Sequence, residues 1–205
     1  MGFYRDTIVP RLIAVAMKTE EATRYRRELV PQACGRVLEI GIGSGLNLEH
    51  YSQRAEQVVG VEPSTALLAM ARRRISLAPC PVILAQESAE TLPFDDASFD
   101  TVLTTWTLCS IERPKRALEE IRRVLRPDGR LVFIEHGRAE EVSVQRWQDR
   151  VNPCWRCVAG GCNINRPIDR LIETAGFRIG ALETGYLVKG PRLLTYHFKG
   201  VAAKV

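Results

Sequence analysis

The sequence has no long apolar run, no low-complexity tract and no tail or stripe of charge of one sign; its longest basic run is Arg72-Arg73-Arg74. The longest apolar stretch near the N-terminus, 8–17, is interrupted by Pro10 and Arg11, so it is too short and too broken to span a membrane, and no signal-peptide cleavage pattern accompanies it. The 29 basic and 24 acidic residues give a net charge of +5 that is dispersed along the chain, which is weak support for nucleic-acid binding. We therefore expect a cytoplasmic protein with no nucleic-acid partner.

Cysteine is also sparse. Six cysteines in 205 residues, without a secretion signal, are too few for a disulfide scaffold, so we expect free thiols. With 45% hydrophobic residues, 15 glycines and 11 prolines, the composition is that of an ordinary globular protein and excludes the disordered, collagenous and coiled-coil classes. A chain of this length predicts one domain.

What the sequence does contain is an alternation of short apolar runs with helical patterns. The runs predict buried strands at 37–40, 57–61, 82–85, 101–105 and 130–134, and the helical spacing predicts helices at 46–52, 65–77 and 114–125. This order is typical of an α/β fold with a Rossmann-like, doubly wound, mostly parallel sheet.

The ends of the chain depart from that order. Beyond residue 134 a polar stretch is followed by a predicted helix at 166–174 and by two strand-like runs at 177–187 and 195–202. The connection Lys189-Gly190-Pro191 suits an antiparallel hairpin at the edge of the sheet. Residues 5–29 are helical and amphipathic, and they predict an N-terminal helical cap over the carboxyl edge of the sheet.

A glycine-rich turn carries the strongest functional signal. The first predicted strand runs into Gly41-Ile42-Gly43-Ser44-Gly45, where a backbone without Cβ atoms can approach a ligand. A dinucleotide-binding loop would place its third glycine at Leu46 and would not require the acid Glu39. Because a carboxylate disfavours a nearby pyrophosphate, Glu39 favours a ligand with positive charge, and S-adenosylmethionine carries an ammonium and a sulfonium.

A second acid supports the same ligand. Glu62 ends the next predicted strand about 20 residues after the turn, where a carboxylate can accept both ribose hydroxyls. Either feature alone is often just a tight turn, but their order and spacing together favour a bound nucleoside.

These motifs resemble those of class I S-adenosylmethionine-dependent methyltransferases. The segments 88–100 and 124–130 are similar to that family's adenine-side loop and to its turn into the fifth strand. The resemblance implies that S-adenosylmethionine is the cofactor and S-adenosylhomocysteine the product. It implies cofactor contacts from Glu39, Gly41, Gly43, Gly45, Asn47, Glu62, Pro63, Ser88, Ala89 and Thr104.

A closer resemblance extends past that core. Leu108-Cys109-Ser110, Glu135-His136 and the segments 152–155 and 160–163 resemble those of the membrane-associated alkyl thiol S-methyltransferases. The resemblance implies a small apolar thiol as acceptor, although the hydrophobic anchor of those enzymes has no counterpart here. Contact with a membrane surface is therefore not supported, and the sequence indicates no oligomeric state. His136 follows the fifth predicted strand at the edge where open α/β sheets bind substrates, so it is the candidate catalytic base, and the alternative is a structural histidine hydrogen-bonded in a loop.

Two other functions remain open at this point: an N- or O-methyltransferase of a small molecule or lipid, and a non-catalytic module that only binds S-adenosylmethionine. Cys154, Cys157 and Cys162 invite a metal or redox interpretation, but a structural zinc site needs a fourth ligand that is not evident, so we expect no metal. The predicted single domain spans 1–205, with a helical cap at 1–35, a cofactor-binding core at 36–135 and a substrate-side segment with the sheet edge at 136–205.

Overall fold

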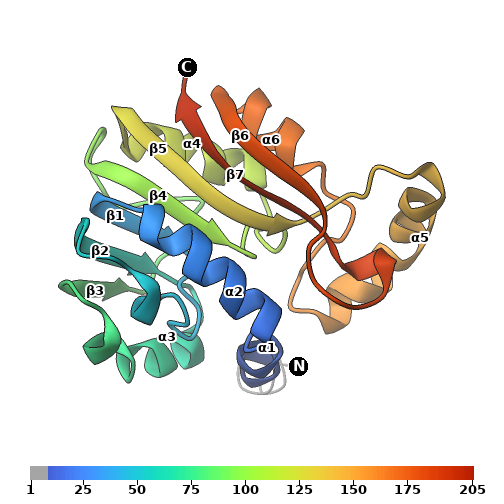
Figure 1. Cartoon of the computed structure of the whole chain (residues 1–205), viewed down its shortest axis with the longest axis horizontal. Coiled ribbons are helices and arrows are strands. Elements are labelled where there is room, and N and C mark those ends of the chain that lie inside the picture. The colour runs from blue at the N-terminus through green and yellow to red at the C-terminus, as the bar shows by residue number, and fades with distance from the viewer. Residues whose placement is uncertain (1–8) are drawn as a thin grey trace.

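The structure is a computed structural model that describes residues 9–205, and its centre is one sheet of seven strands (Figure 1). The strand order is β3-β2-β1-β4-β5-β7-β6. The strands are β1 (Gly35–Ile40), β2 (Ala55–Val61), β3 (Val82–Ala85), β4 (Phe99–Thr105), β5 (Leu125–His136), β6 (Phe177–Tyr186) and β7 (Tyr196–Lys204). The helices are α1 (Val9–Ala16), α2 (Glu20–Leu29), α3 (Thr65–Arg72), α4 (Pro114–Val124), α5 (Val142–Val158) and α6 (Ile168–Thr174).

Strands β1 to β5 pair in parallel, and β7 pairs antiparallel with both β5 and β6. The predicted fold class is thereby confirmed, including the antiparallel pair at the C-terminal edge. Because all parallel strands end at one edge, that edge collects the loops that follow β1, β2 and β4, and open α/β sheets bind ligands there.

The two faces of the sheet bury two apolar clusters, because successive strand residues point to opposite sides. Leu38 of β1 belongs to a cluster with residues of α4 and α6, and its neighbour Val37 belongs to a cluster with residues of α2 and α3. Both side chains are fully buried. Truncating such a side chain to alanine costs about 2–5 kcal/mol of stability, so the sheet is a rigid support for the loops at its edge.

Some predicted helices differ from the structure. The segment 46–52 forms only the 3-10 turn Leu48–His50 instead of a helix, because the side chains of Asn47 and Tyr51 both turn inward to bind Glu39. The predicted cap helix is divided into α1 and α2, since Thr19 accepts a hydrogen bond from the Ala22 amide and starts a new helix. Residues 5–8 of that prediction lie outside the described residues.

The polar stretch after β5 contains α5, a helix of 17 residues that the sequence did not predict. Apolar residues do recur at helical spacing along it, but Trp147 and Val158 are exposed, its buried residues are the polar Gln148 and Asn152, and Pro153 lies inside it. Figure 1 shows α5 set to one side of the sheet, close to the 3-10 turn Arg192–Leu194 that precedes β7. None of the helices in residues 9–205 combines the length and the apolar character needed to cross a bilayer.

Candidate functional site

A cavity of about 370 Å³ opens at the carboxyl ends of β1, β2 and β4. This volume is within the range of small-molecule sites, which is roughly 300–1,000 Å³. Its lining comes from the glycine-rich turn, the end of β2, the loop before β4 and the cap helices, and includes Ala14, Met17, Arg26, Gly41, Gly43, Asn47, Glu62, Pro63, Ser88, Ala89, Trp106, Ser110, Ile111 and Gly160.

Two of the three glycines of the turn line this cavity. Gly41 has φ +66°, and a Cβ added there would lie 2.4 Å from Cγ2 of Thr107. Gly43 has φ +55°, and a Cβ added there would meet no heavy atom closer than the Gly41 carbonyl oxygen at 3.8 Å. Gly45 does not line the cavity and packs against Ala71 of α3. The turn therefore leaves open space for a ligand beside the backbone of Gly43. At Gly41 and Gly45, neighbouring residues occupy the space where a side chain would lie.

Glu62 stands in the cavity wall with its carboxylate fixed by two backbone amides. The Gly43 amide donates to one carboxylate oxygen at 3.3 Å and the Ser64 amide to the other at 2.9 Å. The side chain is buried, and burial raises the pKa of its carboxyl. Each oxygen receives one amide and keeps acceptor capacity for a further donor, which is what a pair of ribose hydroxyls would use.

Glu39 lies behind the cavity wall instead of in it. Its carboxylate is fully buried, accepts a hydrogen bond from Asn47 Nδ2 at 2.8 Å, and accepts another from the Tyr51 hydroxyl at 2.6 Å. Burial raises its pKa to about 7. Asn47 does line the cavity, and its Oδ1 accepts from Arg26 Nε at 3.1 Å. The structure thus gives Glu39 contact with Asn47, where the resemblance implied contact with the ligand.

The other predicted cofactor residues lie close to one another. Pro63, Ser88 and Ala89 line the cavity beside Glu62. Thr104 is fully buried in β4 and does not line the cavity, whereas its neighbour Thr105 does. Neighbouring strand residues face opposite sides of a sheet, so Thr105 lines the cavity and Thr104 points away from it.

The sequence analysis did not predict several of the lining residues, among them Arg26 on α2 and Trp106 directly after β4. The Arg26 guanidinium lies over the Trp106 ring, and its Nη1 donates to the Met17 carbonyl at 2.9 Å. Burial lowers the pKa of Arg26 to about 10, so it stays charged at neutral pH. Trp106 has φ +53°, rare for a side chain of this size, and its position at the end of a predicted strand was the signal that could have found it.

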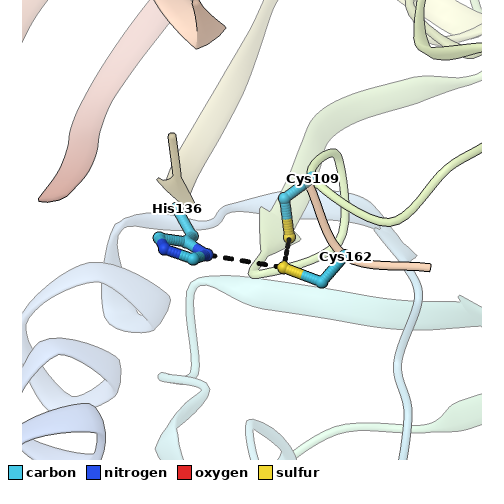
Figure 2. Close-up of side chains that lie close together, drawn as sticks. All are labelled: Cys109, His136 and Cys162. Atoms are coloured by element: carbon cyan, nitrogen blue, oxygen red, sulfur yellow. Dashed lines mark hydrogen bonds between the residues drawn. The ribbon is translucent and has the colours of Figure 1, made fainter. Parts of the chain in front are cut away.

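His136 ends β5 and does not line the cavity. Its Nδ1 lies 3.4 Å from Cys162 Sγ, and Cys162 Sγ lies 3.6 Å from Cys109 Sγ (Figure 2). The hydrogen bond with Cys109 and the neighbouring His136 lower the pKa of the Cys162 thiol. The structure therefore brings Cys162 to Cys109 and His136, while Cys154 and Cys157 are exposed on α5.

Glu135 precedes His136 and is fully buried. Its two carboxylate oxygens accept the backbone amides of Thr107 at 3.1 Å and Cys109 at 3.3 Å. Burial raises its pKa to about 7. Glu135 thus fixes the loop after β4, which carries Trp106 and Ser110 into the cavity wall.

Comparisons with known proteins agree with this arrangement. Residues 38–133 match a family described as a methyltransferase domain. Thiol S-methyltransferase TMT1A of Homo sapiens is 30% identical over 206 residues, which cover 98% of this chain and 83% of that protein. Phosphatidylethanolamine N-methyltransferase of Cereibacter sphaeroides is 39% identical over 123 residues, which cover 58% of this chain and 60% of that protein.

A solved structure shows the same fold. The phospholethanolamine N-methyltransferase 2 of Haemonchus contortus, in complex with phosphomonomethylethanolamine and S-adenosylhomocysteine, has a TM-score of 0.67 at 19% identity. The match covers 89% of this chain and 52% of that chain. The match to TMT1A spans most of both proteins at a level of identity that indicates common descent. The chain belongs to the S-adenosylmethionine-dependent methyltransferases.

Proposed function

We propose that this methyltransferase transfers the methyl group of S-adenosylmethionine to the sulfur of a small apolar thiol. The observation that carries the proposal is the extent of the match to thiol S-methyltransferase TMT1A, which covers 98% of this chain. A match of 123 residues, such as that to the phosphatidylethanolamine N-methyltransferase, leaves about two fifths of the chain unaccounted for. Residues outside the 38–133 core, including α1, α2 and the loop at Gly160, supply part of the cavity wall.

The cavity residues fit the cofactor. In this proposal Glu62 accepts the two ribose hydroxyls with its remaining lone pairs, and bare backbone at Gly43 admits the ligand where a side chain would stand. Ser88 and Ala89 lie at the adenine, and Asn47, held by the Glu39 carboxylate, lies at the methionine end. S-adenosylmethionine supplies an already activated methyl group, so the protein's part is to bind, align and exclude water.

The remaining lining suits an apolar acceptor. Met17, Trp106 and Ile111 bring apolar surface to the cavity, and Ala14 extends it along α1. In the transfer the thiolate sulfur forms a bond to the methyl carbon as the bond from that carbon to the sulfonium breaks, and the acceptor's proton goes to solvent or a base. Only a few per cent of an ordinary thiol is ionised at neutral pH, and the charged Arg26 in the wall favours the thiolate form.

His136 has no role in the proposed transfer. That it is the base that takes the acceptor's proton stays a prediction. The reason is its position: its Nδ1 faces Cys162, and the side chain is not part of the cavity wall.

The direct test is methyl transfer from labelled S-adenosylmethionine to matched acceptors that differ only in the reacting atom: one alkyl chain bearing a thiol, an alcohol or an amine. We expect label on the thiol, and we expect the Glu62→Ala variant to lose that activity at limiting cofactor. Methylation of the amine or alcohol but not of the thiol would contradict the proposal. Binding of S-adenosylhomocysteine without turnover of any acceptor would indicate a module that only binds the cofactor.

Phosphatidylethanolamine is the second candidate acceptor, favoured by the 39% identity to the N-methyltransferase over 123 residues. Vesicles containing this lipid belong in the same assay. Label in the lipid headgroup, with none on the alkyl thiol, would assign N-methylation.

A further inference from the structure

Two thiols and an imidazole meet behind the cavity, from three segments that are distant in the sequence. Cys109 lies in the loop after β4, His136 ends β5, and Cys162 lies in the loop after α5 (Figure 2). The three donor atoms lie within 4.8 Å of one another, and Cys109 and His136 are buried. Neither the cofactor site nor the proposed transfer uses this cluster.

Two of the three distances between the donors match those between ligands around one tetrahedral ion. Zinc bonds of about 2.3 Å to sulfur and about 2.0–2.1 Å to nitrogen place two sulfurs roughly 3.8 Å apart and a sulfur and a nitrogen roughly 3.6 Å apart. The Cys109 and Cys162 sulfurs are 3.6 Å apart, and Cys162 Sγ and His136 Nδ1 are 3.4 Å apart. The third pair, Cys109 Sγ and a ring nitrogen of His136, lies within 4.8 Å, and for an ion to enter, side-chain rotation would have to bring this pair to the same spacing.

The backbone that carries the donors is fixed independently of any ion. The Cys109 carbonyl accepts from the Asn163 amide at 2.8 Å and from its side-chain Nδ2 at 3.0 Å, which ties the loop of Cys162 to that of Cys109. Asn163 Oδ1 in turn accepts from Asn152 of α5 at 3.2 Å. Glu135 accepts the Cys109 amide, as described above. Such outer contacts orient ligands in metal sites.

The chemistry of the three donor atoms determines which metal ions fit between them. Thiolate and imidazole are the ligands of zinc and similar transition metals, whereas Mg²⁺ and Ca²⁺ take oxygen ligands. A disulfide between Cys109 and Cys162 would use no imidazole. Within residues 9–205, His136 Nε2 is buried without a hydrogen-bond partner, so Nδ1 is the atom through which this ring makes its polar contact, at Cys162.

We propose that Cys109, His136 and Cys162 form a site for one zinc-class divalent ion, with three protein ligands and a fourth position left for water or another exogenous ligand. Binding requires both cysteines as thiolates, so any thiol proton still present is released, and it forms a neutral assembly of one divalent ion, two thiolates and one imidazole. Ser110 lines the cavity, and its Oγ lies 3.6 Å from Cys109 Sγ, so the ion would lie within one side chain of the cavity wall. This proposal differs from the expectation of no metal, which considered Cys162 together with Cys154 and Cys157 instead of with Cys109 and His136.

The test measures metal directly on the untagged full chain. After incubation with Zn²⁺ and removal of free ion, elemental analysis should find about one zinc per chain, and Co²⁺ should give thiolate-to-cobalt charge-transfer absorption. Cys162→Ser and His136→Ala should weaken binding by more than the 10- to 100-fold typical of losing an outer contact. Cys154→Ser and Cys157→Ser, at exposed positions on α5, are the matched controls and should bind like the unmodified chain.

Three results would overturn the site: no stoichiometric zinc with fully reduced thiols, equal loss of zinc in the Cys154→Ser control, or cobalt absorption without a thiolate band. Binding of S-adenosylhomocysteine, measured on each variant by calorimetry, verifies that the variant is folded. The readout does not depend on the acceptor, so a chain that binds zinc but methylates only amines would keep this site and lose the thiol proposal.

Discussion

The guanidinium carbon of Arg26 lies 5.0 Å from the ring centroid of Trp106, and both side chains line the cavity. Arg26 comes from α2 and Trp106 from the end of β4, so this cation–π pair connects the N-terminal helices to the sheet at the ligand site. Such a pair contributes about 0.5–2 kcal/mol, depending on its desolvation. The N-terminal helices are therefore part of the cavity wall.

Trp106 should report cofactor binding. It lines the cavity, whereas Trp147 is exposed on α5 and Trp155 is absent from the cavity wall. Titration with S-adenosylhomocysteine should change the tryptophan fluorescence of the unmodified chain and leave that of Trp106→Phe nearly constant, although calorimetry still detects binding. A full fluorescence change in Trp106→Phe would place the ligand elsewhere.

Glu62→Ala should weaken S-adenosylhomocysteine binding by about 10- to 150-fold, because a charge-assisted hydrogen bond contributes about 1.5–3 kcal/mol. Calorimetry measures the effect. Glu56→Ala is the matched control, since Glu56 lies on the same strand near its amino end and is exposed. Equal affinities of the two variants would remove Glu62 from the ribose site.

The sequence predicted the sheet well because its parallel strands are short apolar runs, and most residues of β1, β2 and β4 are buried. Residues 82–85 and 101–105 fall inside β3 and β4, and the C-terminal pair is antiparallel as expected. Helix α5 was not predicted, since Pro153 lies inside it and its buried positions are a glutamine and an asparagine that hydrogen-bond to loops distant in sequence. Its apolar residues include the exposed Trp147 and Val158, so they do not mark a buried face.

In the site, too, residues fixed by the local sequence could be predicted, and residues brought together by tertiary packing could not. Gly43 and Glu62 could be found because a turn and the end of a strand fix them locally, and both line the cavity. Arg26 could not be found, because it reaches the cavity only through the packing of α2 across the sheet. The cluster of Cys109, His136 and Cys162 likewise depends on the end of β5 and two loops converging, which residue spacing alone does not encode.

Glu39 should make stability depend on pH. Burial raises its pKa from 4.5 to about 7, so the folded protein holds this proton more tightly than the unfolded chain does. The stabilisation is complete below about pH 4.5 and is lost as the pH rises through about 7. Glu135 also makes the folded state less stable as the pH rises through about 7, since burial raises its pKa to about 7 as well.

Denaturant unfolding between pH 4.5 and 8 should therefore show a smaller loss of stability in Glu39→Gln than in the unmodified chain. The amide still accepts from Asn47, and the Tyr51 hydroxyl can rotate to accept from it. Glu119→Gln, at an exposed position of α4, should leave the profile unchanged. A Glu39→Gln profile as steep as that of the unmodified chain would show that the carboxyl is ionised throughout this range.

Gly41→Ala and Gly43→Ala should separate stability from binding. At Gly41 the new methyl group would lie 2.4 Å from Cγ2 of Thr107, so the loop after β4 must move. The unfolding free energy should therefore fall by more than the roughly 1–2 kcal/mol that alanine costs in the left-handed backbone conformation. At Gly43 the nearest atom is 3.8 Å away, so the cost should stay near that value. The Gly43 methyl would instead occupy space beside the cavity, and S-adenosylhomocysteine affinity should fall although the chain is folded. Denaturant unfolding and calorimetry on both variants check this, and unchanged affinity in Gly43→Ala would show that the ligand does not approach the turn there.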